Sequence, residues 1–267
     1  MGIKINVKIV ILSILISLIM YPKTIAFLIT AVGNLNVARK LDAGTVNGSK
    51  AITDTDKTRI VFMFDDGWES VCLKAYGIME KYDYTASISV IPSLVGGNGY
   101  MSYDQLAELY LQGWELLNHS YSHKESAYDN SGELLADFNR ARQWMKNRYI
   151  GNCSDMLIIP YGEINPYLIN RLKAEGYDSV RTSDNIIILN KNKIEYYPIT
   201  AVNLLTKVAV NEVKDILVQA FNEPKTVIFV LHKIGYEDDG LDMTYSEDKL
   251  EEIIIFINEH ADKLKVI

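Results

Sequence analysis

Residues 59–68 read RIVFMFDDGW, and this stretch decides the fold. Its unbroken apolar run is typical of a strand that is buried on both faces of a sheet. The run stops at two adjacent carboxylates, Asp65 and Asp66, which Gly67 follows. In parallel α/β folds the functional site lies at the carboxyl ends of the strands. The stretch therefore predicts such a site, and the alternative is an Asx-type turn in which Gly67 supplies the unusual backbone angles.

Segments typical of strands and of helices alternate along the rest of the chain. Apolar runs at 85–91, 114–118, 156–159 and 226–231 indicate strands, whereas 103–112, 133–149, 211–222 and 246–260 indicate helices. Such alternation predicts right-handed crossovers and a mostly parallel sheet. Because several strands end in polar residues, we expect an α/β barrel with its site at the strand ends. An open doubly wound sheet is the alternative.

Composition narrows the classes of function. The chain has 267 residues, of which 48% are hydrophobic, and its net charge is −7. Nucleic acid is not an expected partner, because the chain has no basic stripe. No glycine-rich phosphate loop follows a strand, so a nucleotide is not indicated either. The two cysteines, Cys72 and Cys153, form either one disulfide or two free thiols.

The N-terminal segment differs in character from the rest of the chain. Two lysines, Lys4 and Lys8, precede an apolar run at 9–21, and a second apolar run follows at 25–32. We expect residues 1–32 to be a signal peptide or a membrane anchor, which predicts an extracytoplasmic protein, secreted or anchored to the membrane. The alternative is a buried helix of a soluble domain. Residues 33–57 are polar and predict a linker or N-terminal arm before a domain at 58–267.

Two histidines lie close together in the sequence HSYSH at residues 119–123. On a helical turn, His119 and His123 would face the same way. Imidazole nitrogen and carboxylate oxygen suit a divalent first-row metal, zinc above all, and three protein ligands leave a position open for catalysis. A pair of surface histidines is the alternative. His232 directly follows the buried run at 226–231 and is a candidate proton donor to a leaving group.

These motifs resemble those of the polysaccharide deacetylases with a NodB-homology domain, carbohydrate esterase family 4, over residues 58–267. Phe64-Asp65-Asp66-Gly67 matches the first motif, and the resemblance implies that Asp65 is the catalytic base and Asp66 a metal ligand. HSYSH matches the second motif, which implies that His119 and His123 complete the metal site. The family fold, a distorted (β/α)7 barrel, agrees with the pattern of elements above.

Two further motifs of the same family can be matched. Pro160-Tyr161-Gly162 corresponds to the end of the third motif, which implies that the backbone N–H of Tyr161 stabilises an oxyanion. Leu231-His232 corresponds to the fifth motif, which implies that His232 is the general acid. The resemblance thus adds Tyr161 to the expected site and gives His232 the role of proton donor already considered above.

The sequence departs from the family in two places. Ile158 occupies a position where the third motif usually has an arginine. Residues 179–185 match the fourth motif, Asp-x-x-Asp-Trp, only in part: Arg181 replaces the first aspartate and Asn185 the tryptophan. Asp184 remains, and we expect it to orient His232. Because both strands would end at one face of the barrel, Arg181 is a candidate to reach Asp65 and lower its pKa, and the alternative is that Arg181 faces solvent.

The resemblance implies a metal-dependent hydrolase that removes N-acetyl groups from GlcNAc-type units of a surface or extracellular polysaccharide. The metal is expected to be Zn²⁺, with Co²⁺ or Ni²⁺ as alternatives, and the protein is expected to be a monomer. Two other functions stay open at this point: an O-deacetylase acting on acetylated xylan or another O-acetyl glycan, and an inactive glycan-binding domain. The intact acidic residues and histidines of the motifs argue against the inactive domain.

Overall fold

The structure is a computed structural model that describes residues 57–124, 132–148, 150–151, 153–189, 194–198, 200–236 and 240–267. The described residues belong to one compact unit. The predicted signal or anchor at 1–32 lies outside the described residues, as does the predicted linker at 33–57 except for Lys57. Among the described residues, no helix has both the length and the apolar character needed to cross a membrane.

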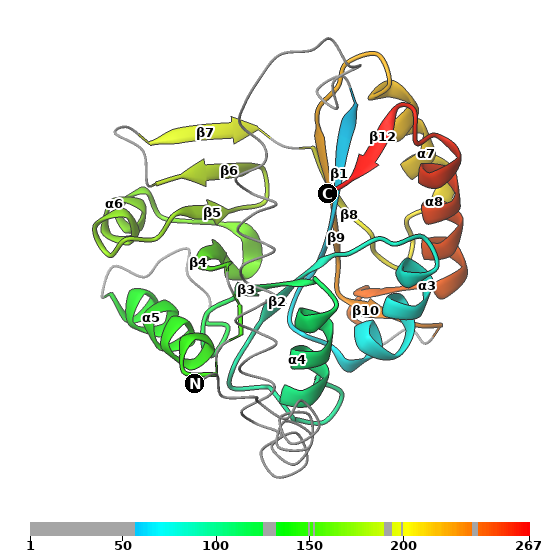
Figure 1. The fold of residues 1–267 in the computed structure, drawn as a ribbon. Helices are drawn as coiled ribbons and strands as arrows, with labels where there is room; N and C mark the ends of the chain where they lie inside the picture. Colours follow the sequence, from blue (N-terminus) through cyan, green and yellow to red (C-terminus); the bar gives the residue numbers. More distant parts are fainter. Residues whose placement is uncertain are drawn as a thin grey trace, which may run out of the picture. The chain divides into compact units, whose positions relative to one another are not determined.

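A curled ten-stranded sheet organises the domain (Figure 1). Its order is β7-β6-β5-β4-β3-β2-β1-β9-β8, and β12 pairs in addition with β1. The strands are β1 (Thr58–Phe64), β2 (Ser87–Val90), β3 (Glu115–Asn118), β4 (Cys153–Ile158), β5 (Ser179–Arg181), β6 (Asn185–Ile188), β7 (Glu195–Pro198), β8 (Thr200–Asn203), β9 (Thr226–Leu231) and β12 (Leu264–Val266). All pairs are parallel except β5–β6 and β6–β7.

This sheet confirms the predicted α/β fold, a distorted barrel of mostly parallel strands. The described strands form a half-barrel, because β7 and β8 stand at opposite ends of the sheet order and do not pair with each other. A separate two-stranded sheet joins β10 (Lys233–Ile234) to β11 (Thr244–Tyr245). Strands β8, β10 and β11 were not predicted from the sequence. A π-helical turn, η2, leads into the first helix after Gly67.

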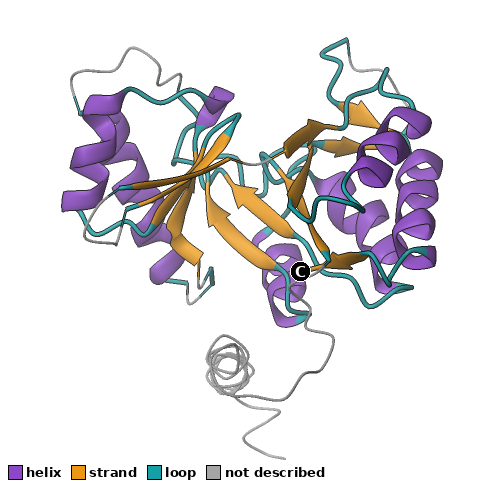
Figure 2. Ribbon diagram, turned by 90° about the horizontal axis from the view of Figure 1, so that it is seen from above, coloured by secondary structure: helices purple, strands orange, loops and turns teal. Residues whose placement is uncertain are grey.

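Helices cover the outer side of the curled sheet (Figure 2). They are η2 (Val71–Ala75), α3 (Tyr76–Glu80), α4 (Tyr103–Leu111), α5 (Glu133–Lys146), α6 (Pro166–Ala174), α7 (Val210–Gln219) and α8 (Glu247–Glu259). A single 3-10 turn, η3 (Pro160–Gly162), follows the carboxyl end of β4 instead. Local sequence signals mark the start of two of the helices. The Ser102 side chain accepts from Gln105 N while Gln105 caps the Ser102 N–H, and Pro166 begins α6.

Alternation along β1 separates the two faces of the sheet. Ile60, Phe62 and Phe64 are fully buried in a hydrophobic cluster to which side chains of η2, α3 and α8 also belong. Met63 points to the other face, inside the curl, in a smaller apolar cluster. That inner cluster also contains Leu117, Ile158, Ile228 and Val230. Since side chains of a strand alternate, Asp65 continues the inner face at the carboxyl end of β1.

The same alternation brings other polar side chains to the inner face. Four polar residues have the parity of the inner face, and each lies within one residue of the carboxyl end of its strand: Ser89 (β2), His119 (β3), Arg181 (β5) and His232 (β9). The carboxyl ends of the parallel strands therefore gather the polar residues at one end of the curl. Cys72 is a free thiol, so it does not form the disulfide considered above.

Candidate active site

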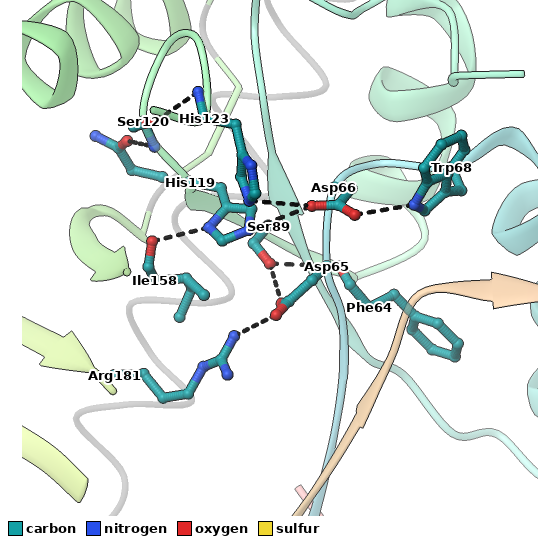
Figure 3. Close-up of polar contacts among 11 residues, drawn as sticks. Phe64, Asp65, Asp66, Trp68, Ser89, His119, Ser120, His123, Ile158 and Arg181 are labelled. Carbon is teal, nitrogen blue, oxygen red and sulfur yellow. Dashed lines mark hydrogen bonds and ion pairs between the residues drawn. The ribbon is translucent and has the colours of Figure 1, made fainter. Parts of the chain in front are cut away.

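The carboxyl end of β1 brings two carboxylates into one site (Figure 3). Strict alternation would send Asp66 to the outer face, away from Asp65. The backbone prevents this, because φ is 73° at Asp66 and 79° at Gly67, and the chain turns sharply. Only Gly adopts such angles without steric cost, which explains the glycine. Both aspartates are buried at this turn.

Asp65 is held by one donor on each carboxylate oxygen. The Ser89 hydroxyl donates a short hydrogen bond to Oδ1, and Arg181 Nη2 donates to Oδ2 at 2.5 Å. The ion pair is well shielded from water, since the side chains of Arg181 and Asp65 are 6% and 7% exposed. Burial by itself would raise the pKa of Asp65. The charges of Arg181, His119 and His232, together with the Ser89 hydrogen bond, outweigh burial and hold this pKa well below its usual range.

The position of Arg181 explains why Ile158 is tolerated. These two residues are register partners on the adjacent strands β4 and β5. The guanidinium that the family usually supplies from β4 therefore reaches Asp65 from the next strand. The prediction that Arg181 contacts Asp65 is confirmed, and the alternative of a solvent-facing Arg181 is wrong, because this residue is buried.

Asp66, His119 and His123 form a set of three potential metal ligands within 4.8 Å of one another. Asp66 Oδ1 is 3.4 Å from His119 Nε2 and 3.5 Å from His123 Nε2. In a tetrahedral site with bonds of about 2.0–2.2 Å to the metal, ligand atoms lie about 3.3–3.6 Å apart. The three side chains thus fit a divalent ion such as zinc in their chemistry, and the two distances from Asp66 to the histidines fit its spacing. They leave a fourth position for water or substrate.

Backbone contacts orient the two histidines. His119 Nδ1 lies 2.8 Å from the carbonyl oxygen of Ile158. A carbonyl only accepts, so Nδ1 carries the proton and Nε2 is free to ligate. The helical turn expected for residues 119–123 is wrong: they form a loop in which φ is 61° at Ser120 and 54° at His123. These left-handed angles, and not an i, i+4 relation on a helix, bring His123 beside His119.

Helix α5 supports the histidine loop from outside the site. The backbone N–H of Ser122 donates to Asp137 Oδ2 at 2.8 Å, and the Ser122 hydroxyl contacts the same carboxylate. Asn118 links the loop to α5 as well, because its side chain donates to Phe138 O at 3.0 Å and accepts from Ser120 N. The loop conformation that places His123 is thereby tied to a regular helix.

The pKa values of the two histidines are shifted in opposite directions. Burial opposes the protonated form of His119, but the carboxylates of Asp66 and Asp65 outweigh burial and raise its pKa. Burial and the neighbouring charge of His119 lower the pKa of His123. The pKa of Asp66 is lowered, because hydrogen bonding to His119 and the histidine charges outweigh burial. Asp66 is therefore an anionic ligand at neutral pH, as a cation site requires.

A cavity of about 260 Å³ opens onto these groups. His232 and Tyr161 both line it, in agreement with their predicted place in the site. Tyr161 has φ 62°, and its ring, 64% exposed, lies 4.9 Å from the ring of His123. The cavity thus brings the side chains of Asp65, Asp66, His119, His123, Tyr161 and His232 together.

Asp184 does not make the contact predicted for it. It is exposed, in the turn between the antiparallel strands β5 and β6. In the sheet order, β4, β3, β2 and β1 separate β5 from β9, which delivers His232. Nδ1 of His232 is buried and has no hydrogen-bond partner within the described residues. The strand beside β9 is β8, and its last residue, Asn203, lines the same cavity.

Residues 52–180 match the family described as "Polysaccharide deacetylase". This chain carries a polysaccharide deacetylase domain. The matched region contains the carboxylates at the end of β1, the histidine loop and Tyr161, but it ends before His232. A comparison with curated proteins gives no match.

Solved structures share the fold of this deacetylase domain. The Bc1960 peptidoglycan N-acetylglucosamine deacetylase is 15% identical, with a TM-score of 0.57 over 80% of this chain and 87% of that one. A family 4 carbohydrate esterase from Streptomyces lividans, in complex with acetate, is 15% identical, with a TM-score of 0.52 over 78% and 91%. BA3943, a CE4 family pseudoenzyme from Bacillus anthracis, is 14% identical, with a TM-score of 0.52 over 80% and 65%.

Three residues of the deacetylase site escaped the sequence analysis. Ser89 contacts Asp65, Trp68 donates to Asp66, and Asn203 lines the cavity. A signal existed for Ser89, since it is a hydroxyl residue in a fully buried strand and has the parity of the inner face. Trp68 adjoins the first motif but could equally have been a core aromatic residue. Asn203 had no signal, because its strand was not predicted.

Proposed function

We propose that this protein is a metal-dependent hydrolase that removes N-acetyl groups from GlcNAc-type units of a surface or extracellular polysaccharide. The observation that carries the proposal is the pairing of a clamped carboxylate, Asp65, with an adjacent three-ligand set that opens to one cavity. Membership of the polysaccharide deacetylase family supports hydrolysis of an acetyl group. A structural neighbour named as a peptidoglycan N-acetylglucosamine deacetylase supports the choice of the N-acetyl sugar.

Asp65 is the group that accepts a proton from the attacking water. Arg181 and Ser89 fix the direction of its carboxylate, and the low pKa keeps it ionised over the whole neutral range. A fixed acceptor removes the need to reorient the base during reaction. A divalent ion held by Asp66, His119 and His123 would supply electrophilic activation of the water and of the acetyl carbonyl.

Tyr161 and His232 complete the proposed chemistry. The left-handed backbone of Tyr161 at the cavity supports a role for its N–H as a donor to the oxyanion that forms at the carbonyl. His232 protonates the departing amine nitrogen, so the products are acetate and a free amino sugar. The buried Nδ1 of His232 is free of protein partners in the described part of the chain, which leaves its tautomer to be set by substrate or water.

The remaining parts of the proposal concern the setting of the reaction. We place the protein outside the cytoplasm, secreted or anchored by residues 1–32, because a polymer of the cell surface is found there. We expect zinc as the native metal, with cobalt or nickel as substitutes, since imidazole and carboxylate ligands accept all three. The protein is proposed to act as a monomer, with the polysaccharide as its partner.

Acetate release from defined glycans tests the function. The purified full chain, loaded in turn with zinc, cobalt or nickel, is incubated with chitooligosaccharides, with peptidoglycan fragments and with acetylated xylan. Asp65→Asn serves as the matched control, because it keeps the shape of the base and cannot take the proton. We expect metal-dependent release from the N-acetyl substrates alone, abolished in the control. Release from acetylated xylan alone would establish the O-deacetylase instead, and glycan binding without release would establish the inactive domain.

A further inference from the structure

The two oxygens of the Asp66 carboxylate have different surroundings (Figure 3). Oδ1 faces His119 Nε2 at 3.4 Å and His123 Nε2 at 3.5 Å. Oδ2 accepts a hydrogen bond from Trp68 Nε1 at 3.0 Å. The side chain of Asp66 is only 9% exposed, and the hydrogen bond is partly buried. Oδ1 therefore faces the other two potential ligands, whereas Oδ2 is hydrogen-bonded to the indole of Trp68.

The indole itself is held in place on both faces. Tyr100 stacks on it with centroids 4.2 Å apart and an interplanar angle of 23°. Lys233 Nζ lies 4.0 Å from the ring centroid. A phenol ring and an ammonium group cannot occupy the same space, so they cover opposite faces. The ring is thus fixed with its one polar atom aimed at Asp66.

Backbone contacts fix the segment that carries the indole. Glu69 N donates to Gly99 O at 2.8 Å, and Met101 N donates to Gly67 O at 2.9 Å. Trp68 and Tyr100 also form an isolated antiparallel bridge. Residues 67–69 are therefore hydrogen-bonded to residues 99–101 on both sides of the stacked pair. The indole has little freedom to turn away from Asp66.

We propose that Trp68 is a positioning residue that restricts Asp66 to ligating through Oδ1 alone. A carboxylate can bind a metal with one oxygen or with two. If Asp66 used both, its second oxygen would fill a position that a catalytic site keeps open for water or substrate. An indole N–H donates and cannot ligate, so it occupies Oδ2 without competing for the metal. This inference rests on the metal site of the proposed function.

Cobalt spectroscopy of the full chain tests the role of Trp68. Trp68→Phe keeps an aromatic ring between Tyr100 and Lys233 but removes the donor. We expect the cobalt-loaded variant to show a visible absorption band several-fold weaker than wild type, because a second Asp66 oxygen raises the coordination number. We also expect about tenfold weaker metal binding in competition with a chromophoric chelator, as is usual when a ligand loses its hydrogen-bond partner.

Controls separate positioning from folding. Trp144→Phe changes a tryptophan of α5 that packs on Arg148 and the core, and its cobalt spectrum should equal that of wild type. Tyr100→Leu leaves the donor but removes its support, so it should shift the spectrum in the same direction as Trp68→Phe. Tyr100→Leu also tests the proposal if Trp68→Phe does not fold. Circular dichroism of the metal-free proteins identifies a variant that is unfolded.

The outcomes are distinct for the two proposals. Cobalt binding to wild type with identical spectra in Trp68→Phe and Tyr100→Leu would overturn the role of Trp68 and leave the metal site standing. Absence of cobalt binding to wild type would overturn the metal site itself, and with it the proposed function. A spectrum that changes in both variants and not in Trp144→Phe supports the inference.

Discussion

Replacing Arg181 by methionine is the sharpest test of how the proposed catalytic base, Asp65, is tuned. The substitution removes the guanidinium 2.5 Å from Asp65 and leaves an apolar side chain of similar length. Two unit charges about 4 Å apart interact by about 4 kcal/mol at an effective dielectric constant near 20, which corresponds to about 3 pKa units. Since neighbouring opposite charges lower carboxylate pKa values by about 1–3 units, we expect the pKa of Asp65 to rise by that amount.

The pH profile of kcat/KM measures this change, because its acidic limb follows the base of the free enzyme. Without the cation, burial favours the protonated carboxyl, so activity is lost at a higher pH than in wild type. The limb of Arg181→Met should therefore move up by about 1–3 pH units. Arg181→Lys is the matched control, since it keeps the charge and should hold the limb near its wild-type position.

The free energy of unfolding gives a second measurement of the Arg181–Asp65 ion pair. Because the folded-state pKa of Asp65 is lowered, its ionisation stabilises the fold above its unfolded-state pKa, and this contribution is lost as pH falls toward the folded value. Breaking a buried pair on one side costs about 3–5 kcal/mol. Urea unfolding of Arg181→Met should show that loss at pH 7 and a smaller one near pH 3. An unmoved acidic limb with normal turnover in Arg181→Met would refute the reasoning.

Further substitutions separate the roles inside the site. Asp65→Asn should keep the metal and lose most turnover, whereas Asp66→Asn should lose metal affinity. Metal content and acetate release are measured for both variants, and the reverse pattern would show that the two roles are swapped. The double variant His119→Ala/His123→Ala should purify without tightly bound metal, and a stoichiometric amount of metal in it would contradict the ligand assignment. Ser89→Ala should lower the free energy of unfolding by about 1.5–3 kcal/mol in urea. It should also move the acidic limb of the pH profile upward, by less than Arg181→Met does. Unchanged stability and an unmoved limb would show that the hydrogen bond from Ser89 to Asp65 is unimportant.

The chemistry of the site was largely predictable from the sequence. An apolar strand that ends in two carboxylates and a glycine marks a site at a strand end, and this holds in the structure for Asp65 and Asp66. Imidazole beside carboxylate indicates a divalent metal, and the structure brings His119 and His123 to Asp66. These features are local, because they depend on residue type and on the alternation of side chains along one strand.

Other contacts depended on the tertiary structure. Arg181 meets Asp65 across 116 residues only because β4 and β5 pair in a register that sets it beside Ile158. Asp184, which the motif pattern assigned to His232, lies far along the sheet, since strand order and not sequence order decides which strand ends are neighbours.

The sequence by itself determined the α/β class, the strand that carries the carboxylates and the kinds of group in the site. The tertiary structure alone showed Ser89 on Asp65 and Trp68 on Asp66, and it decided between the two alternatives that the sequence left for Arg181. The physical reason is that periodicity fixes the face on which a side chain lies, whereas a contact between strands depends on their order, register and curl. Those quantities are set by packing of the whole sheet, so no single stretch of the chain contains them.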